Sequence, residues 1–160
     1  SIEALAAFQG VRRRLEVRGT VGGVTVIDDF AHHPTAIATT IAGLRARMQA
    51  GNHSGGRLLA VLEPRSNTMR TGTLKAQLPA SLKGADLVFC YAGGIDWDAQ
   101  AALAPLGERV AVLRDMPALE AAILAAARPG DQVLVMSNGG FGGIHGRLLT
   151  GLASREGNGK

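Results

Sequence analysis

The sequence is poor in the residues on which several protein classes depend. Cys90 is the only cysteine among 160 residues, so no intrachain disulfide can form, which favours an intracellular, cytoplasmic protein. No apolar run approaches the roughly 18 residues of a membrane-spanning helix, and no signal peptide is recognisable. Aromatic residues make up 4% of the chain and basic residues form no long run, which argues against nucleic-acid binding.

A phosphate-holding loop of the Walker type is also missing. No G-x-x-x-x-G-K-[ST] segment occurs, and the only Gly-Lys pair is Gly159–Lys160 at the end of the chain. The glycine-rich segment 139–143 does not match the dinucleotide fingerprint, because His145 stands where its third glycine would fall. We therefore expect no self-sufficient nucleotide site of either type.

The residues that are present indicate one globular domain. Apolar residues make up 46% of the chain, enough for a substantial core. The net charge is +4, and only three of the 17 basic residues are lysines. Arginine suits planar contacts to carboxylate or phosphate, which makes an anionic substrate plausible, although genome composition explains the preference equally well.

Short apolar runs alternate with helical stretches, which predicts a layered α/β domain with a mostly parallel sheet. We expect helices at 2–8, after Pro34, at 74–82, at 98–103, from Pro117 and after the glycines 139–143. The expected strands are 15–18, 24–28, 58–62, 86–91, 109–113 and 132–136. The domain is expected to span residues 1–153, with a disordered tail at 154–160.

Four polar side chains, Asp28, Asp29, His32 and His33, lie between the end of one expected strand and Pro34. Ligands of open parallel sheets bind beyond the carboxyl ends of the strands, so this cluster is a candidate site. Carboxylates accept ribose hydroxyls or bind Mg²⁺, and imidazoles donate to phosphate or move a proton. The alternative is that the aspartates cap a turn and the histidines are solvated.

Two further polar clusters also follow expected strands. The first contains Arg65, Ser66, Asn67, Thr68 and Arg70. These side chains suit the binding of a carboxylate, and the alternative is an ordinary polar loop before a helix. The second is Ser137, Asn138 and the glycines 139–143. Glycines let a ligand approach the backbone closely, and a tight turn that packs the last helix on the sheet explains them equally well.

Two of these clusters resemble the third domain of the Mur ligase family. The family spacing F-x-G-V-x-R-R-x-E is present as Phe8, Gly10, Val11, Arg13, Arg14 and Glu16. The segment D-D-F-A-H-H-P-T at 28–35 is similar to the family's D-D-Y-x-H-H-P-T-E, with Phe30 for Tyr and Ala36 for Glu. The loop L-E-P-R-S-N-T-M at 62–69 resembles the murein tripeptide ligases and differs from the Q-P-H-R-Y-[ST]-R loop of the alanine-adding members.

The resemblance implies a Rossmann-like, three-layer domain that closes over a central ATPase domain outside this chain. The complete enzyme would use ATP to activate UDP-N-acetylmuramate as an acyl phosphate, which the tripeptide L-alanyl-γ-D-glutamyl-meso-diaminopimelate then attacks. ATP and Mg²⁺ would be held mainly by the missing domains, so this chain alone is expected to be inactive. The alternatives are the same domain of the L-alanine ligase and a stand-alone nucleotide-binding module.

The resemblance also implies roles for individual residues. Asp28 and Asp29 would lie near the nucleotide, whereas His32 would face the incoming amine and His33 either site. The substrate-binding candidates are Phe30, Arg65, Ser66, Asn67, Ser137 and Asn138. We assign no metal ligand, because adjacent histidines on an extended segment point to opposite faces.

Overall fold

The computed structural model describes residues 15–31, 33–51, 56–63, 72–93, 98–137 and 141–158. Six strands form one sheet in the order β1-β2-β6-β3-β4-β5. Only β1 runs antiparallel to its neighbour; the other pairs are parallel, as the sequence predicts. The strands are β1 (Glu16–Val21), β2 (Val24–Asp29), β3 (Leu58–Leu62), β4 (Leu87–Tyr91), β5 (Val110–Leu113) and β6 (Gln132–Met136).

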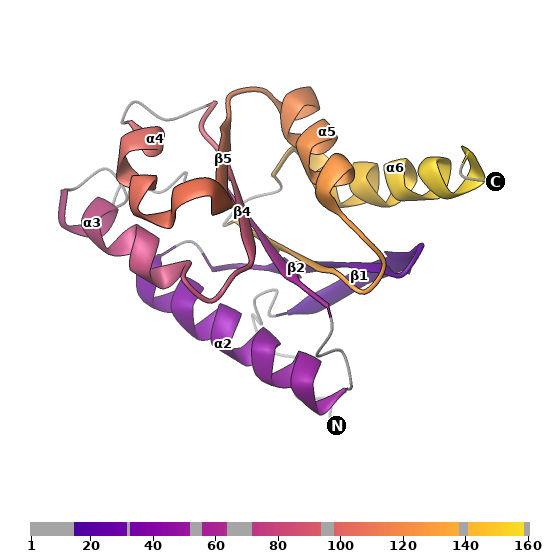
Figure 1. The fold of residues 1–160 in the computed structure, drawn as a ribbon, viewed down its shortest axis with the longest axis horizontal. Helices are drawn as coiled ribbons and strands as arrows, with labels where there is room; N and C mark the ends of the chain where they lie inside the picture. Colours follow the sequence, from indigo (N-terminus) through magenta and orange to yellow (C-terminus); the bar gives the residue numbers. More distant parts are fainter. Residues whose placement is uncertain are drawn as a thin grey trace.

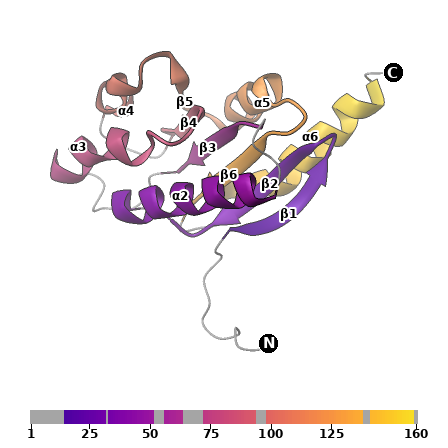
Figure 2. The same ribbon diagram turned by 60° about the horizontal axis from the view of Figure 1, so that its bottom comes forward.

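Helices cover both faces of the sheet, which makes three layers (Figure 1, Figure 2). On one face lie α2 (Pro34–Ala50), α3 (Gly72–Ser81) and α4 (Ala99–Ala102), and on the other lie α5 (Met116–Ala126) and α6 (Ile144–Asn158). Alternate residues of β3 pack against the helices on opposite faces of the sheet, because successive side chains of a strand point to opposite faces. Leu58, Ala60 and Leu62 pack toward α2, whereas Leu59 and Val61 pack toward α5 and α6.

Helix α2 forms where the apolar spacing predicts it. Its first residue is Pro34, whose missing N–H costs nothing in the first turn, and His33 caps it by accepting from the Thr35 N–H. The predicted stripe is buried against the sheet and consists of Ile37, Ile41, Leu44 and Met48. The helix therefore starts at the carboxyl end of β2 and fixes the position of the polar residues between them.

The β1–β2 hairpin turns on two glycines. Gly22 and Gly23 have φ values of 61° and 82°, a backbone region that favours glycine. Gly19 lies inside β1, where the pairing register shifts between Val17 and Gly19. Leu149 of α6 lies directly over Gly19, at 3.1 Å from where a Cβ would stand.

Helix α3 agrees with the expected range 74–82 to within two residues, whereas two short 3₁₀ stretches were not expected. Helix α3 continues past Pro79 and ends in tighter turns, in which Leu82 donates to the Pro79 carbonyl. A 3₁₀ stretch, η2 (Ala104–Arg109), follows α4 and was not expected. Another short one, η3 (Phe141–Gly143), precedes α6. The expected entry helix at 2–8 lies outside the described residues.

The tail is helical as far as the structure describes it, which corrects the expectation of disorder from residue 154. Helix α6 runs to Asn158, and Arg155 donates to the carbonyl oxygens of Leu124 and Ala127. These acceptors lie at the end of α5, so the last turns of the two helices are joined. Among the described helices, none is both long and apolar enough to cross a membrane.

At the amino ends of the central strands, a buried carboxylate joins three segments. Asp131 accepts from the Arg57 backbone N–H, from its Nε at 3.2 Å and its Nη2 at 2.7 Å, and from the Arg128 N–H. Arg57 also donates to the Ala126 carbonyl at the end of α5. The hydrogen bonds that Asp131 accepts raise the pKa of the Arg57 guanidinium, so this guanidinium stays charged.

Asp131→Asn is expected to destabilise the chain by about 3 kcal/mol, because the buried Asp131 side chain loses the charge that its half-buried partner Arg57 contacts. Urea unfolding followed by circular dichroism measures this change. The matched control is Glu120→Gln, which breaks a more exposed ion pair, that of Glu120 with Arg147, and is expected to cost less than about 1 kcal/mol. Equal losses in the two variants would contradict a special role for the buried pair.

Candidate functional site

The carboxyl ends of three neighbouring strands meet at one edge of the sheet. The Ser137 N–H donates to the Asp29 carbonyl at 3.2 Å, and the Glu63 N–H donates to the Met136 carbonyl at 3.1 Å. The Ser137 hydroxyl donates to Oε1 of Glu63 at 2.6 Å. The segments that leave β2, β6 and β3 are thus joined side by side, which is where a parallel sheet binds its ligands. We call these strand ends, with the start of α2, the carboxyl edge.

The two aspartates at the end of β2 point to opposite faces of the sheet. Asp29 faces the α2 layer and Asp28 faces the α6 layer, as strand alternation requires. Both are buried, with Asp28 at 0% and Asp29 at 2% exposed. A buried carboxylate needs hydrogen-bond partners, so the contacts of each define what it does.

Asp29 is satisfied by its own chain. Its Oδ1 accepts from the Ala31 N–H at 2.8 Å and from the Thr40 hydroxyl at 3.3 Å. Its Oδ2 accepts from the Leu15 N–H at 2.8 Å. These contacts fix the turn between β2 and α2 and support the turn-capping alternative raised from the sequence. Its assignment to the nucleotide stays a prediction.

Asp28 joins three elements. Its Oδ1 lies 2.8 Å from Nε2 of His145 in the first turn of α6, and its Oδ2 lies 3.5 Å from Nη1 of Arg18 in β1. His145 is itself only 4% exposed. The pair is a polar contact inside the apolar layer between the sheet and α6.

The remaining predicted site residues divide into two groups. Phe30 and His33 are half-buried at the carboxyl edge, beside the start of α2, and Ser137 is fully buried between Asp29 and Glu63. The structure thus brings together the ends of the first and third polar clusters. The residues outside the described part of the chain are His32, Arg65, Ser66, Asn67 and Asn138.

The described residues offer neither a metal centre nor a reactive thiol. Within these ranges no three side chains of His, Cys, Asp or Glu lie close enough together to hold a metal ion. Burial raises the pKa of the Cys90 thiol to about 12, so the thiolate needed for nucleophilic attack does not form near neutral pH. Cys90 is a small core residue of β4, as its position in an apolar strand predicts.

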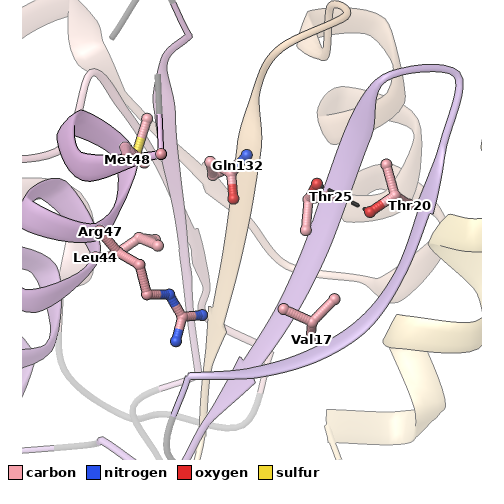
Figure 3. A pocket seen from close by; sticks show the side chains of 8 residues that line it. Val17, Thr20, Thr25, Leu44, Arg47, Met48 and Gln132 are labelled. Carbon is pink, nitrogen blue, oxygen red and sulfur yellow. Dashed lines mark hydrogen bonds between the residues drawn. The ribbon is translucent and has the colours of Figure 1, made fainter. Parts of the chain in front are cut away.

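A hollow of about 410 Å³ opens at the opposite edge of the sheet (Figure 3). Figure 3 shows Leu44, Arg47 and Met48 of α2 on one side and the β1–β2 hairpin on the other, with Gln132 between them. Gln132 and Thr25 stand at the amino ends of β6 and β2. The hollow is therefore separate from the carboxyl edge, and its position does not match the ligand site of a parallel sheet.

His145 is a buried polar residue that is not among the candidates predicted from the sequence. A helical spacing places it on the same face of α6 as the buried residues Leu148 and Leu152, which marks it as inward-facing. A buried histidine requires a polar partner, and Asp28 stands at the end of a buried strand. Only the fold brings these two residues, 117 positions apart, into contact.

The model of the family "Mur ligase, glutamate ligase domain" matches residues 13–139 of the chain. The chain belongs to the Mur ligase family. This match covers the β1–β2 hairpin, the carboxyl edge and every strand of the sheet. The resemblance seen in the motifs is thereby confirmed.

Individual Mur ligases resemble the chain over nearly its whole length. The UDP-N-acetylmuramate–L-alanyl-γ-D-glutamyl-meso-2,6-diaminoheptandioate ligase of Escherichia coli is 48% identical over 95% of the chain. A UDP-N-acetylmuramate–L-alanine ligase of a Mycobacterium species is 39% identical over 96% of it. A crystallised murein peptide ligase of Psychrobacter arcticus superposes with a TM-score of 0.79 at 39% identity, covering 94% of this chain and 32% of that one. The chain spans about a third of the length of the curated relatives, 33% in both cases.

Replacing Asp29 tests its role in the turn between β2 and α2. Asp29→Asn turns one carboxylate oxygen into a donor that faces an N–H group, so we expect a loss of about 2 kcal/mol in the free energy of unfolding. Thr40→Val removes only one hydrogen bond and is expected to cost about 1 kcal/mol. Urea unfolding of both variants measures the difference. An Asp29→Asn variant with the wild-type free energy of unfolding would show that the turn does not need the carboxylate.

Proposed function

We propose that the chain is the C-terminal domain of a ligase that joins UDP-N-acetylmuramate to L-alanyl-γ-D-glutamyl-meso-diaminopimelate in peptidoglycan recycling. The observation that carries this proposal is the 48% identity to the Escherichia coli ligase over 95% of the chain. The L-alanine ligase is the second candidate, supported by the 39% identity to a mycobacterial relative. The tripeptide ligase is favoured because its similarity is higher over the same stretch.

In this proposal the carboxyl edge forms half of a cleft, and the preceding domains of the same enzyme supply the other half. Bound ATP with Mg²⁺ would supply the phosphoryl group that activates the muramyl carboxylate. The chain's own contribution is to complete the nucleotide site, hold the amine and exclude water from the reactive acyl phosphate.

The described residues fit a nucleotide only in part, which supports a shared site. Helix α2 begins at the carboxyl edge, and its first turn carries no acidic residue, so the positive end of its dipole favours an anion nearby. No described cluster holds a metal ion, and the carboxylates of Asp28 and Asp29 are engaged within the chain. Mg²⁺ is therefore assigned to the preceding domains.

The residue roles are those that the family resemblance implies. Asp28 and Asp29 shape the segment next to the nucleotide, His32 faces the incoming amine, and His33 serves either site. Phe30, Ser137 and Asn138 would line the peptide site, with Arg65, Ser66 and Asn67 contacting a substrate carboxylate. We place the complete enzyme in the cytoplasm, where its nucleotide-linked substrate and ATP occur together.

The complete ligase is expected to form product from UDP-N-acetylmuramate, ATP and the tripeptide, with a strong preference for the tripeptide over free L-alanine. Product is measured by chromatography and mass spectrometry in a competition between the two amines. A preference for L-alanine would reassign the domain to the second candidate, and failure with both amines would reject the ligase assignment.

The chain by itself is expected to hydrolyse no ATP and to show no micromolar affinity for it, because it lacks the Walker loop and half of the proposed site. Isothermal titration calorimetry with ATP and Mg²⁺ measures the affinity. Micromolar binding by this chain alone would favour a stand-alone nucleotide-binding module.

A further inference from the structure

The contact between His145 and Asp28 links two segments that leave the sheet at the carboxyl edge. Asp28 immediately precedes Asp29 and Phe30 at the end of β2, and His145 lies in the first turn of α6, shortly after the end of β6. Their side chains meet at 2.8 Å with almost no exposure to solvent. Because both side chains are buried polar groups in direct contact, they hold the two segments at a defined spacing.

The backbone before His145 needs such an anchor. Phe141, Gly142 and Gly143 all have positive φ values, of 50°, 60° and 73°. This region is unfavourable for a bulky residue such as Phe141, and it persists only where surrounding contacts enforce it. Arg147 donates to the Gly142 carbonyl at 2.6 Å, and Phe141 is buried against Tyr91 with ring centroids 5.9 Å apart.

Two described side chains reach Asp28 from different elements. Arg18 reaches it from the edge strand β1 and remains 41% exposed, at the longer distance of 3.5 Å. His145 reaches it from α6 and is buried. The shorter, buried contact holds the carboxylate more rigidly, so His145 fixes the orientation of Asp28 more strongly than Arg18 does.

We propose that His145 is a positioning residue of the ligase reaction. It contacts no substrate; it acts through Asp28, by holding the end of β2 and the start of α6 in the register that the carboxyl edge requires. This inference rests on the proposed function. It adds a residue that lies far along the sequence from the motif it serves.

The central test compares His145→Leu with His145→Gln in the complete enzyme. Leucine fills the space without a donor, whereas glutamine carries an amide nitrogen at nearly the same reach as Nε2. We expect His145→Leu to lower kcat/KM for the amine by about tenfold to a hundredfold, because small displacements of reacting groups are costly. His145→Gln should recover most of this loss. The KM for UDP-N-acetylmuramate should not change, since the preceding domains are proposed to bind it.

Leu148→Ala is the matched control for a purely structural effect. Leu148 lies one turn after His145 on the same buried face of α6, and it is 1% exposed. Its truncation is expected to lower the melting temperature at least as much as His145→Leu does, while kcat/KM below the melting transition stays near the wild-type value. If His145→Leu keeps wild-type kcat/KM, or if Leu148→Ala loses kcat/KM as strongly, the positioning role is wrong.

A double variant tests whether the effect passes through Asp28. If His145 acts through that carboxylate, adding His145→Leu to Asp28→Asn should lower kcat/KM little further than Asp28→Asn alone. Fully additive losses would overturn the proposal. The wild-type enzyme is assayed first with tripeptide and L-alanine, and the amine that it uses serves for all variants. A wrong assignment of the amine substrate then shows in the wild-type assay, and a wrong role for His145 shows only in the variants.

Discussion

Two adjacent carboxylates at the end of β2 must both be satisfied away from water, and they point to opposite layers. Asp29 takes up hydrogen bonds from the β2–α2 turn and from Thr40, whereas Asp28 holds His145 of α6. Because a buried carboxylate without hydrogen-bond partners is unfavourable, the start of α2 and the start of α6 are fixed to the same strand end. The geometry of the carboxyl edge follows from this double attachment.

The sequence predicts most of the fold, because the central strands are buried on both faces and consist of uninterrupted apolar runs. The expected ranges 58–62 and 132–136 agree with β3 and β6 in every residue, and the helical stripe from Ile37 to Met48 identifies α2. These elements carry their signal locally. The family motif added the correct three-layer arrangement.

The departures depend on contacts between distant residues. The register shift in β1 accompanies the packing of Leu149 on Gly19, and the last turns of α6 are joined to α5 by Arg155. A local sequence pattern predicts neither the contact of Leu149 with Gly19 nor the hydrogen bonds of Arg155. At the candidate site, the sequence predicts where the polar clusters gather, but strand alternation sends Asp28 and Asp29 to different layers. The role of His145 depends on the same long-range geometry.

The register shift in β1 has a consequence for the isolated domain. A regular edge strand presents a straight row of unpaired backbone groups, to which a second copy of the same strand can add. In β1 the irregularity between Val17 and Gly19 interrupts that row, and the charged residues Glu16 and Arg18 flank Val17, which is 53% exposed. Irregular, charged edges are a common protection against intermolecular strand pairing. This edge therefore disfavours aggregation of the isolated domain.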